Sequence, residues 1–131
     1  MIIIWYENLD KNNFLIRLYE EVPKILNVRF SNVRIEDEGQ MVCFSFDMPR
    51  FADNPPAKWK ELEDNTVHVE VSFSAVEKLT LKGLKEDYIG DLAIDIDNSG
   101  LVNAKITGTF DLSIIAEYGF IDSVSGYKKL N

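Results

Sequence analysis

Residues 66–73 read Thr-Val-His-Val-Glu-Val-Ser-Phe, which is the most regular alternation of apolar and polar residues in this chain. Successive side chains of a β-strand point to opposite faces, so the alternation predicts a strand with one buried, valine-rich face. The pattern is interrupted at residues 74–77 and resumes with Leu79 and Leu81. We therefore expect one long strand with a β-bulge, or two strands that bend at this point.

An irregular segment leads into this strand, and residues 49–59 read Pro-Arg-Phe-Ala-Asp-Asn-Pro-Pro-Ala-Lys-Trp. Its tryptophan, Trp59, has two interpretations. The indole can cover an end of the hydrophobic core, or it can anchor a bound partner, since loops carry function and tryptophan is frequent at binding hot spots. Large aromatic side chains contribute most when they are buried, so we favour the first interpretation.

A predicted hairpin precedes this segment. Residues 25–35 are apolar and extended in character, but the parity of their apolar positions changes near residues 31–32, which predicts a bulge there. Residues 41–47 alternate regularly between apolar and polar side chains. Glu38 and Gly39 form a turn signal between the two runs, so we expect two antiparallel strands.

The second half of the chain predicts more strands joined by short turns. Residues 84–90 are charged and indicate a loop. Strands are expected at residues 91–97 and directly after the Asp-Asn-Ser-Gly turn at residues 97–100. The apolar run at residues 112–116 fits a strand or a helical turn, and its two adjacent isoleucines favour a strand. A last short strand is expected around residues 120–124.

One helix is predicted near the start of the chain. Apolar residues recur at helical spacing from Phe14 to Val22, for about three turns, and Pro23 ends the pattern. The segment around Trp5 fits a short strand or an extended lead-in. Because no other helix remains for parallel crossovers, we predict an α+β fold: a mainly antiparallel β-sheet of about seven or eight strands with one N-terminal helix packed on it.

Composition narrows the classes of partner. The 131 residues, 46% of them hydrophobic, suffice for one packed core. The chain has 22 acidic and 14 basic residues, a net charge of −8, so its surface field repels phosphate backbones and anionic lipid. We therefore expect neither nucleic acid nor a membrane as partner. The apolar first residues lack a basic region and are too short for a signal peptide, which predicts a cytoplasmic protein.

Residues 95–100 resemble the first half of a calcium-binding loop, with Asp95, Asp97 and Ser99 at alternate positions before Gly100. Such a loop also needs a glutamate at its twelfth position, where this chain has Ile106, and a helix on each side. Strands are predicted there instead. We therefore interpret the segment as a hairpin turn and predict no metal site.

No catalytic residue or cofactor is predicted. His68 is the single histidine and lies on the polar face of a strand without a nucleophile beside it, so we expect it to be solvated or paired across the sheet. Cys43 is the single cysteine, which excludes an internal disulfide, and nothing in its surroundings indicates a reactive thiol. Glycine-rich phosphate loops are absent from the sequence.

Acidic residues gather at two places that the predicted strands flank. One cluster consists of Glu36, Asp37 and Glu38 at the first hairpin turn, and the second surrounds the later strands. The second cluster comprises Glu86, Asp87, Asp91, Asp95 and Asp97. Charged residues usually only solvate a surface, but such clusters can also form a docking face that steers a basic protein.

A set of features is spread in order along nearly the whole chain: Trp5, the segment Val-Pro-Lys-Ile-Leu-Asn-Val at residues 22–28, the hairpin about Gly39, Pro55, Pro56 and Trp59, the valine-rich strand, and the closing Ser125-Gly126-Tyr127. Together they resemble the immunity protein 50 family, which is found beside toxin genes in bacterial polymorphic toxin systems. The resemblance implies a single immunity-protein-like domain over residues 1–131, which binds a cognate protein toxin stoichiometrically and has no turnover of its own. The family brings no catalytic residues.

Three hypotheses follow. The leading one is a toxin-neutralising protein whose partner-binding residues are the acidic ones at positions 36–38, 91, 95 and 97, together with Trp59. The alternative is a small-ligand-binding or enzymatic β-rich domain with a pocket near Trp59 and His68, which would need several polar groups converging on a concave site. The third is a structural or self-associating module, because the sequence leaves the oligomeric state open.

Overall fold

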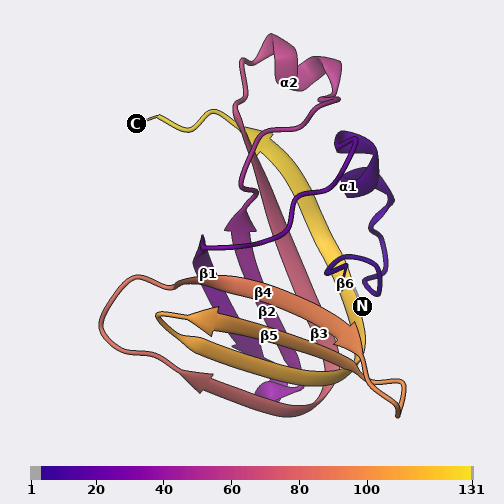
Figure 1. Ribbon diagram of the computed structural model, residues 1–131, viewed down its shortest axis with the longest axis vertical. Helices are drawn as coiled ribbons and strands as arrows, with labels where there is room; N and C mark the ends of the chain where they lie inside the picture. The colour runs from indigo at the N-terminus through magenta and orange to yellow at the C-terminus, as the bar shows by residue number, and fades with distance from the viewer. Residues whose placement is uncertain (1–3, 131) are drawn as a thin grey trace.

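The computed structural model describes residues 4–130 of the chain. Six antiparallel strands form one closed barrel in the order β1-β2-β3-β6-β5-β4, accompanied by two short helices (Figure 1). The elements are α1 (Asn13–Leu18), β1 (Val28–Glu36), β2 (Met41–Asp47), α2 (Ala57–Glu61), β3 (Thr66–Lys82), β4 (Ile89–Ile96), β5 (Val102–Gly108) and β6 (Asp111–Tyr127). The predicted α+β class and antiparallel sheet are confirmed, with fewer strands than the seven or eight expected.

The two longest strands form the spine of the barrel. β3 and β6 have 17 residues each and pair along their whole length, from Thr66 with Tyr127 to Lys82 with Asp111. The predicted interruption of β3 is a bulge: the register shifts between Val76 and Lys78, and Ala75 has a φ of 50°. The sequence 66–82 is therefore one long, bent strand.

We expected too many strands because the buried side chains of β6 change from even to odd positions within one strand. Ile114 and Ala116 point into the core from even positions, whereas Ile121 does so from an odd one. The parity changes between Ala116 and Ile121, opposite Ala75, where β3 has a positive φ, and β6 contains one extra residue further on, at Asp122. Pairing with β3 nevertheless continues from Asp111 to Tyr127, so the two runs that we expected as separate elements belong to one strand.

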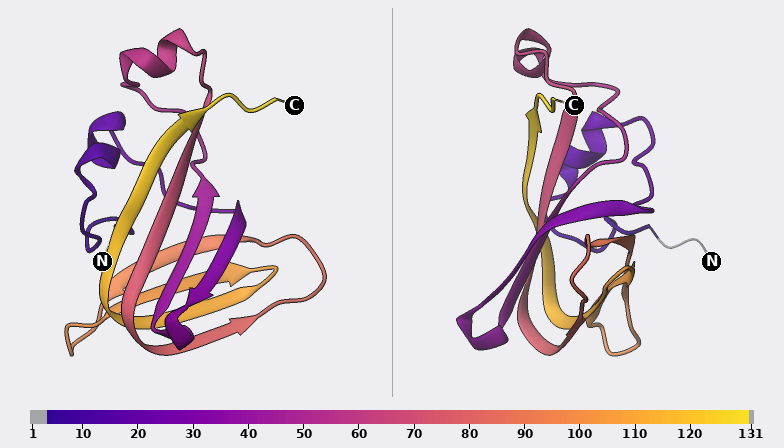
Figure 2. Two further views of the ribbon diagram at one scale, coloured as in Figure 1. Left: turned by 180° about the vertical axis from the view of Figure 1, so that it is seen from behind. Right: turned by 90° about the vertical axis from the view of Figure 1, so that its left-hand side faces the viewer.

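Because β3 and β6 bend, each contributes to two layers. Their outer halves, residues 66–74 of β3 and 118–127 of β6, continue the β1–β2 layer. Their inner halves, residues 76–82 of β3 and 111–116 of β6, form a second layer with β5 and β4, whose strands cross β1 and β2 steeply (Figures 1 and 2). The barrel closes through only two residue pairs, Val28 with Gly90 and Arg29 with Ile89. Beside this closure the backbones of β4 and β5 approach closely, since a side chain at Gly108 would collide with the carbonyl oxygen of Ile89.

The first hairpin is confirmed, with β1 beginning three residues later than expected. Its register shifts between Phe30 and Asn32, which is the predicted bulge. The turn after β1 is bonded from the backbone N–H of Gln40 to the carbonyl oxygen of Asp37, over 3.0 Å. Glu38 has φ 54° and ψ 36°, and Gly39 has φ 87°, the conformation of a type I′ turn.

Helix α1 is shorter than predicted, ending at Leu18 instead of reaching Val22. The carbonyl oxygen of Leu18 accepts the backbone N–H of Asn54 at 2.9 Å, so it does not serve a further helical turn. Tyr19 is extended and buried, and its hydroxyl donates to the carbonyl oxygen of Arg50 at 2.8 Å. The irregular segment before β3 thus ends the helix, because it bonds the carbonyl oxygen that a further helical turn would use.

Helix α2 was not predicted. It lies inside the irregular segment, directly after Pro56, at the upper end of the molecule in Figure 1. A proline followed by alanine and lysine is a signal that could have indicated a short helix, because proline suits a helix start and the next residues favour the helical state.

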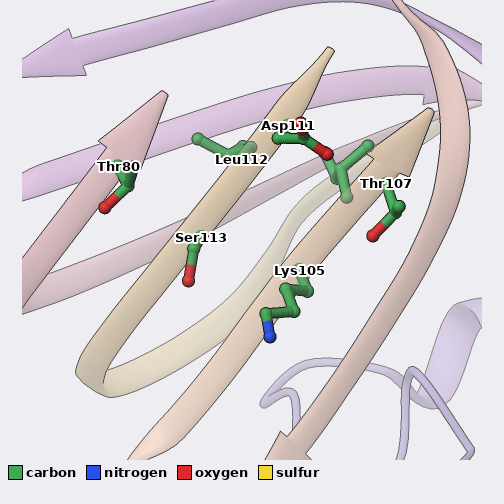
Figure 3. Close-up of a pocket in the computed structure, with 7 residues that line it drawn as sticks. Thr80, Lys105, Thr107, Asp111, Leu112 and Ser113 are labelled. Carbon is green, nitrogen blue, oxygen red and sulfur yellow. The ribbon is translucent and has the colours of Figure 1, made fainter. Parts of the chain in front are cut away.

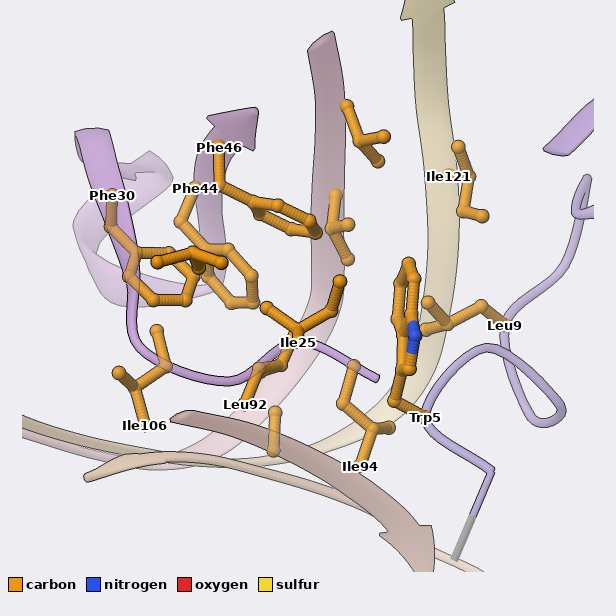
Figure 4. Close-up of a cluster of buried hydrophobic side chains, with 14 of the residues drawn as sticks. Trp5, Leu9, Ile25, Phe30, Phe44, Phe46, Leu92, Ile94, Ile106 and Ile121 are labelled. Carbon is orange, nitrogen blue, oxygen red and sulfur yellow. The ribbon is translucent and has the colours of Figure 1, made fainter. Parts of the chain in front are cut away.

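The core fills the barrel with aromatic side chains from several strands (Figure 4). Phe30, Phe44 and Phe46 pack against one another with ring centroids 5.4 to 6.4 Å apart. Trp5 enters from the N-terminal segment, lies 5.8 Å from Phe46, and donates its indole N–H to the carbonyl oxygen of Pro23 at 3.0 Å. The segment around Trp5 is therefore a turn-rich lead-in that plugs the barrel. Within residues 4–130, no helix has the length and apolar character needed to span a bilayer.

Candidate functional site

The predicted partner-binding residues lie in three separate places. Glu36, Asp37 and Glu38 form the tip of the β1–β2 hairpin, hereafter the acidic tip. Asp91, Asp95 and Asp97 lie on β4 and the turn after it, while Trp59 lies on α2. In the right panel of Figure 2 the β1–β2 and β4–β5 hairpins extend to opposite sides of the molecule. The two acidic clusters therefore do not form one continuous face.

Trp59 covers one end of the sheet. Its ring is half-buried and lies edge-on to Phe14 of α1 at 5.9 Å, with Phe51 at 6.1 Å. A side chain at Gly126 of β6 would come within 2.5 Å of the indole. The indole thus joins the two helices to the end of β6 and acts as a lid, which agrees with the interpretation that it covers an end of the core.

Two of the acidic residues on and after β4 hold loops in place. Asp91 accepts the backbone N–H of Asn27 at 2.7 Å, beside the closure of the barrel. Asp97 accepts hydrogen bonds from Ser99, Leu101 and Asn103 at 2.8 to 3.0 Å, and these bonds, that from Asn103 foremost, lower the pKa of its carboxyl. The predicted hairpin turn at residues 97–100 is confirmed, and its first carboxylate organises it.

The outer face of β4, β5, β6 and the inner half of β3 carries two shallow hollows of about 310 and 290 Å³. They share Lys105 and Ser113, and Figure 3 shows Thr80, Ser113 and Lys105 on three neighbouring strands of the first. Asp95 and Asp97 line the second. Within residues 4–130, no three histidine, cysteine or acidic side chains gather closely enough to hold a metal ion.

The acidic tip is the most exposed of the predicted sites. Glu36 lies 3.6 Å from Arg34, whose guanidinium also donates to Glu70 at 3.1 Å. Asp37 and Glu38 are exposed, and neither carboxylate takes part in an ion pair within the described residues. Both residues adopt left-handed backbone conformations, with φ of 53° and 54°. A side chain with a Cβ resists that conformation, so two free carboxylates are displayed at a conformational cost.

His68 is paired across the sheet, as predicted. Its Nδ1 lies 2.9 Å from a carboxylate oxygen of Asp47, whose other oxygen accepts the Tyr127 hydroxyl at 2.6 Å and the Lys129 ammonium at 3.2 Å. Burial raises the pKa of the Asp47 carboxyl, but these bonds lower it by more, and the net pKa lies below its ordinary value. The same carboxylate raises the pKa of Tyr127 to about 12.

Cys43 is buried in a polar row on the outer face of β2, with 1% of its surface exposed. The Ser72 hydroxyl donates to Asp122 and lies 3.1 Å from the Cys43 sulfur, which in turn lies 3.8 Å from Glu36. Burial raises the pKa of the Cys43 thiol, so it stays protonated at neutral pH and is a poor nucleophile.

The alternative hypothesis requires a pocket near Trp59 and His68, and neither residue lines the two hollows around Lys105 or the hollow beside β1. The imidazole of His68 and the carboxylate of Asp47 are bonded to each other instead of converging on an open cavity.

Sequence reasoning missed two features. The first is the Asp47–Tyr127–Lys129 network, which joins β2 to the C-terminal end of β6. The acid and its partners are 80 and 82 residues apart, so no local spacing signals them. The second is a hollow of about 590 Å³ beside β1. The alternate apolar residues Val33 and Ile35 of β1 are the only hint of it in the sequence.

These features define an acidic α+β domain built on an antiparallel barrel, whose polar groups are bonded to each other at the surface. Residues 11–127 match the family described as Immunity protein 50, and the chain belongs to that family. No curated protein and no solved structure matches the chain.

Proposed function

We propose that this protein is a toxin-neutralising immunity protein, which binds a cognate polymorphic toxin stoichiometrically and carries out no reaction itself. The observation that carries the proposal is membership of the Immunity protein 50 family, matched over residues 11–127. The domain of residues 1–131 would act in the bacterial cytoplasm, where it meets the toxin made by the same cell or by a neighbour.

Charge supports a protein partner with a basic surface. The net charge of −8 favours encounter with a cationic protein and opposes binding to nucleic acid or anionic lipid. The acidic tip concentrates two exposed carboxylates, Asp37 and Glu38, on a projecting hairpin. Asp91 and Asp97, by contrast, are engaged in bonds that hold their own loops. We therefore place the electrostatic contact with the toxin at the acidic tip.

Complex formation tests the function. The purified protein is mixed with the product of the neighbouring gene, carried in a catalytically inactivated form, and the mixture is analysed by size exclusion with light scattering. The expected result is a complex of one to one stoichiometry, and the active toxin should lose its activity at the same ratio. Two proteins that elute separately at micromolar concentration would refute the function.

Charge reversal tests the contact. Asp37→Lys with Glu38→Lys is expected to weaken toxin binding about tenfold or more, because each introduced lysine repels a basic surface. The matched control is Glu20→Lys with Glu61→Lys, which makes the same change in net charge at exposed positions near the helices. Calorimetric titration should find the control within about twofold of the unmodified protein. Equal losses in both variants would show that only overall charge matters.

A further inference from the structure

One edge of β1 is unpaired for most of its length. β1 pairs with β2 from Phe30 to Glu36, but on its other side only Val28 and Arg29 face β4. The last bond on that side is from the backbone N–H of Phe30 to the carbonyl oxygen of Tyr88, at 2.8 Å. Beyond it, residues 32–36 have no second neighbouring strand among the described residues. Their outward N–H and C=O groups are open to another strand.

The opposite side of this gap is also an edge. Residues Lys78 to Lys82 of β3 pair with β6 alone, since β2 pairs with β3 only as far as Ser74. The left panel of Figure 2 shows β1 at the margin of its layer, with the connection from β3 to β4 passing beyond it. The barrel is thus closed at the start of β1 and open along the rest of that strand.

Apolar side chains line the opening. Val33 and Ile35 pair with Phe44 and Val42, both of which point into the core, so they belong to the core face of the sheet. Ile35 is nevertheless 50% exposed. The hollow of about 590 Å³ has a mixed lining, in which Phe30, Val33, Leu81 and Tyr88 lie beside the polar or charged residues Arg29, Ser31, Asn32, Glu86 and Asp87. Residues of the core face are uncovered here because the barrel has no strand at this position.

The charges at the two ends of the opening favour one direction for an extended segment that binds along β1. At the far end of β1 the acidic tip presents the unpaired carboxylates of Asp37 and Glu38. At the near end charges of both signs are mixed, since Arg29 pairs with Asp87 at 3.0 Å and Lys85 lies on the same connection. A basic side chain is therefore favoured beside the acidic tip and not at the other end.

We propose that an extended segment of the toxin adds to this barrel as a further strand along residues 32–36 of β1. Backbone hydrogen bonds supply affinity, apolar side chains at alternate positions cover Val33, Ile35 and Leu81, and a basic residue at one end meets Asp37 and Glu38. This inference rests on the proposed function and names the surface and the kind of toxin segment that it uses.

Amide hydrogen exchange tests the backbone pairing. In the complex with the inactivated product of the neighbouring gene, those amides of residues 32–36 that point away from β2 are expected to exchange at least about tenfold more slowly than in the free protein. The amides of β5, which are already paired on both sides, should be unchanged. A complex that forms without slower exchange at residues 32–36 overturns the inference and leaves the function standing. Failure to form any complex refutes the function itself.

A matched pair of variants tests the edge. Ile35→Lys places a charge on the uncovered face, while Ile96→Lys makes the same change at a position of nearly equal exposure, 47% against 50%, on β4. Ile35→Lys should weaken toxin binding about tenfold or more, with Ile96→Lys and the conservative Ile35→Val within about twofold of the unmodified protein. Ile35→Lys within twofold, in a protein with an unchanged melting temperature, overturns the inference.

A second copy of this chain is the competing occupant. If two β1 edges paired with each other, light scattering on the protein alone would give a dimer whose residues 32–36 are already slow to exchange. That result overturns the proposal of a toxin strand. A monomer with fast exchange at these amides, slowed on addition of the toxin, supports it.

Discussion

Glu38 holds a backbone conformation that glutamate rarely adopts. The first central position of a type I′ turn requires a positive φ, which asparagine and glycine tolerate and which costs other residues about 1 kcal/mol. Glu38→Asn is therefore expected to raise the free energy of unfolding by about 0.5 to 1 kcal/mol while weakening toxin binding, because the carboxylate is lost. Urea denaturation and calorimetric titration measure the two effects.

Glu38→Gln separates the two causes, since it removes the charge and keeps the long side chain in the left-handed conformation. It should weaken binding as much as Glu38→Asn does, without the gain in stability. If both variants are equally stable, the turn imposes no strain on Glu38 and the display of this carboxylate costs the fold nothing.

Asp47 is expected to make the free energy of unfolding depend on pH. Its folded pKa lies below the ordinary value, so the bonds it makes stabilise the fold above about pH 4 and are lost as the pH falls through the folded pKa. Asp47→Asn should lower the free energy of unfolding by about 1 to 2 kcal/mol at pH 7. The difference from the unmodified protein should shrink toward pH 2.5 in urea denaturation series.

Asp95→Asn is the matched control for that series, because Asp95 is exposed and its carboxylate accepts no hydrogen bond within the described residues. A deficit of Asp47→Asn that stays constant from pH 7 to pH 2.5 would contradict the role of the charged carboxylate. The lost stability would then arise from packing alone.

Short-range features of single residues could be predicted from the sequence. The turn at Gly39 was predicted from the Glu38-Gly39 signal between two alternating runs, and strand alternation placed His68 on a polar face, where it was expected to be solvated or paired across the sheet. The bond from Asn27 to Asp91 could not be predicted, because it spans 64 residues and exists only where the barrel closes. A carboxylate that looks free in the sequence is in this way engaged by a distant loop.

At the scale of the elements, Gly126 is the point where β6 meets helix α2. A methyl group there would lie 2.5 Å from the Trp59 ring, so Gly126→Ala must displace the indole. We expect a loss of about 1 to 3 kcal/mol in the free energy of unfolding and a red shift of tryptophan emission. Urea denaturation followed by fluorescence measures both.

A double-mutant cycle checks the cause of that loss. In a Trp59→Ala background the same glycine substitution has no ring to displace, so its cost should fall to about 0.5 kcal/mol or less. An equal cost in both backgrounds would place the strain in the backbone of β6 and not against the lid.

Element types were more predictable than element lengths. The alternation of residues 66–73 identified β3, because period two survives in a strand buried on one side. The length of α1 was wrong, since the spacing of its apolar residues does not reveal that Asn54 binds the carbonyl oxygen of Leu18. Leu15 and Leu18 are buried as expected of a helix packed on the barrel, whereas Tyr19 is buried in an extended conformation.

At the scale of the whole molecule, the charge of −8 predicts the rate at which this protein would bind the basic toxin of the proposed function. The association rate constant should fall about tenfold between 50 and 500 mM sodium chloride, with a smaller change in dissociation, because salt screens long-range attraction before it affects close contacts. Surface plasmon resonance with the inactivated product of the neighbouring gene measures both rates. Association that is insensitive to salt would exclude electrostatic steering.

The fold class was predictable from the whole sequence, and the barrel was not. Alternating runs and short turns indicate antiparallel strands, but they do not say which strand lies beside which. Closure depends on two residue pairs between β1 and β4, and on Trp5 filling the interior from outside the sheet. Both are contacts between distant parts of the chain, and neither has a local signature.

The pairing of β3 with β6 determines at which point of translation the chain can complete its fold. Within residues 4–130, β6 is the only strand that pairs with residues 78–82 of β3, and it also pairs with β5, so a nascent chain that still lacks residues 111–127 leaves both ladders unformed. The polypeptide must therefore be synthesised through β6 before the barrel can close around its core. Until β6 is synthesised, the valine-rich β3 lacks one of its two neighbouring strands, and an exposed strand edge of this kind is prone to aggregation before folding is complete.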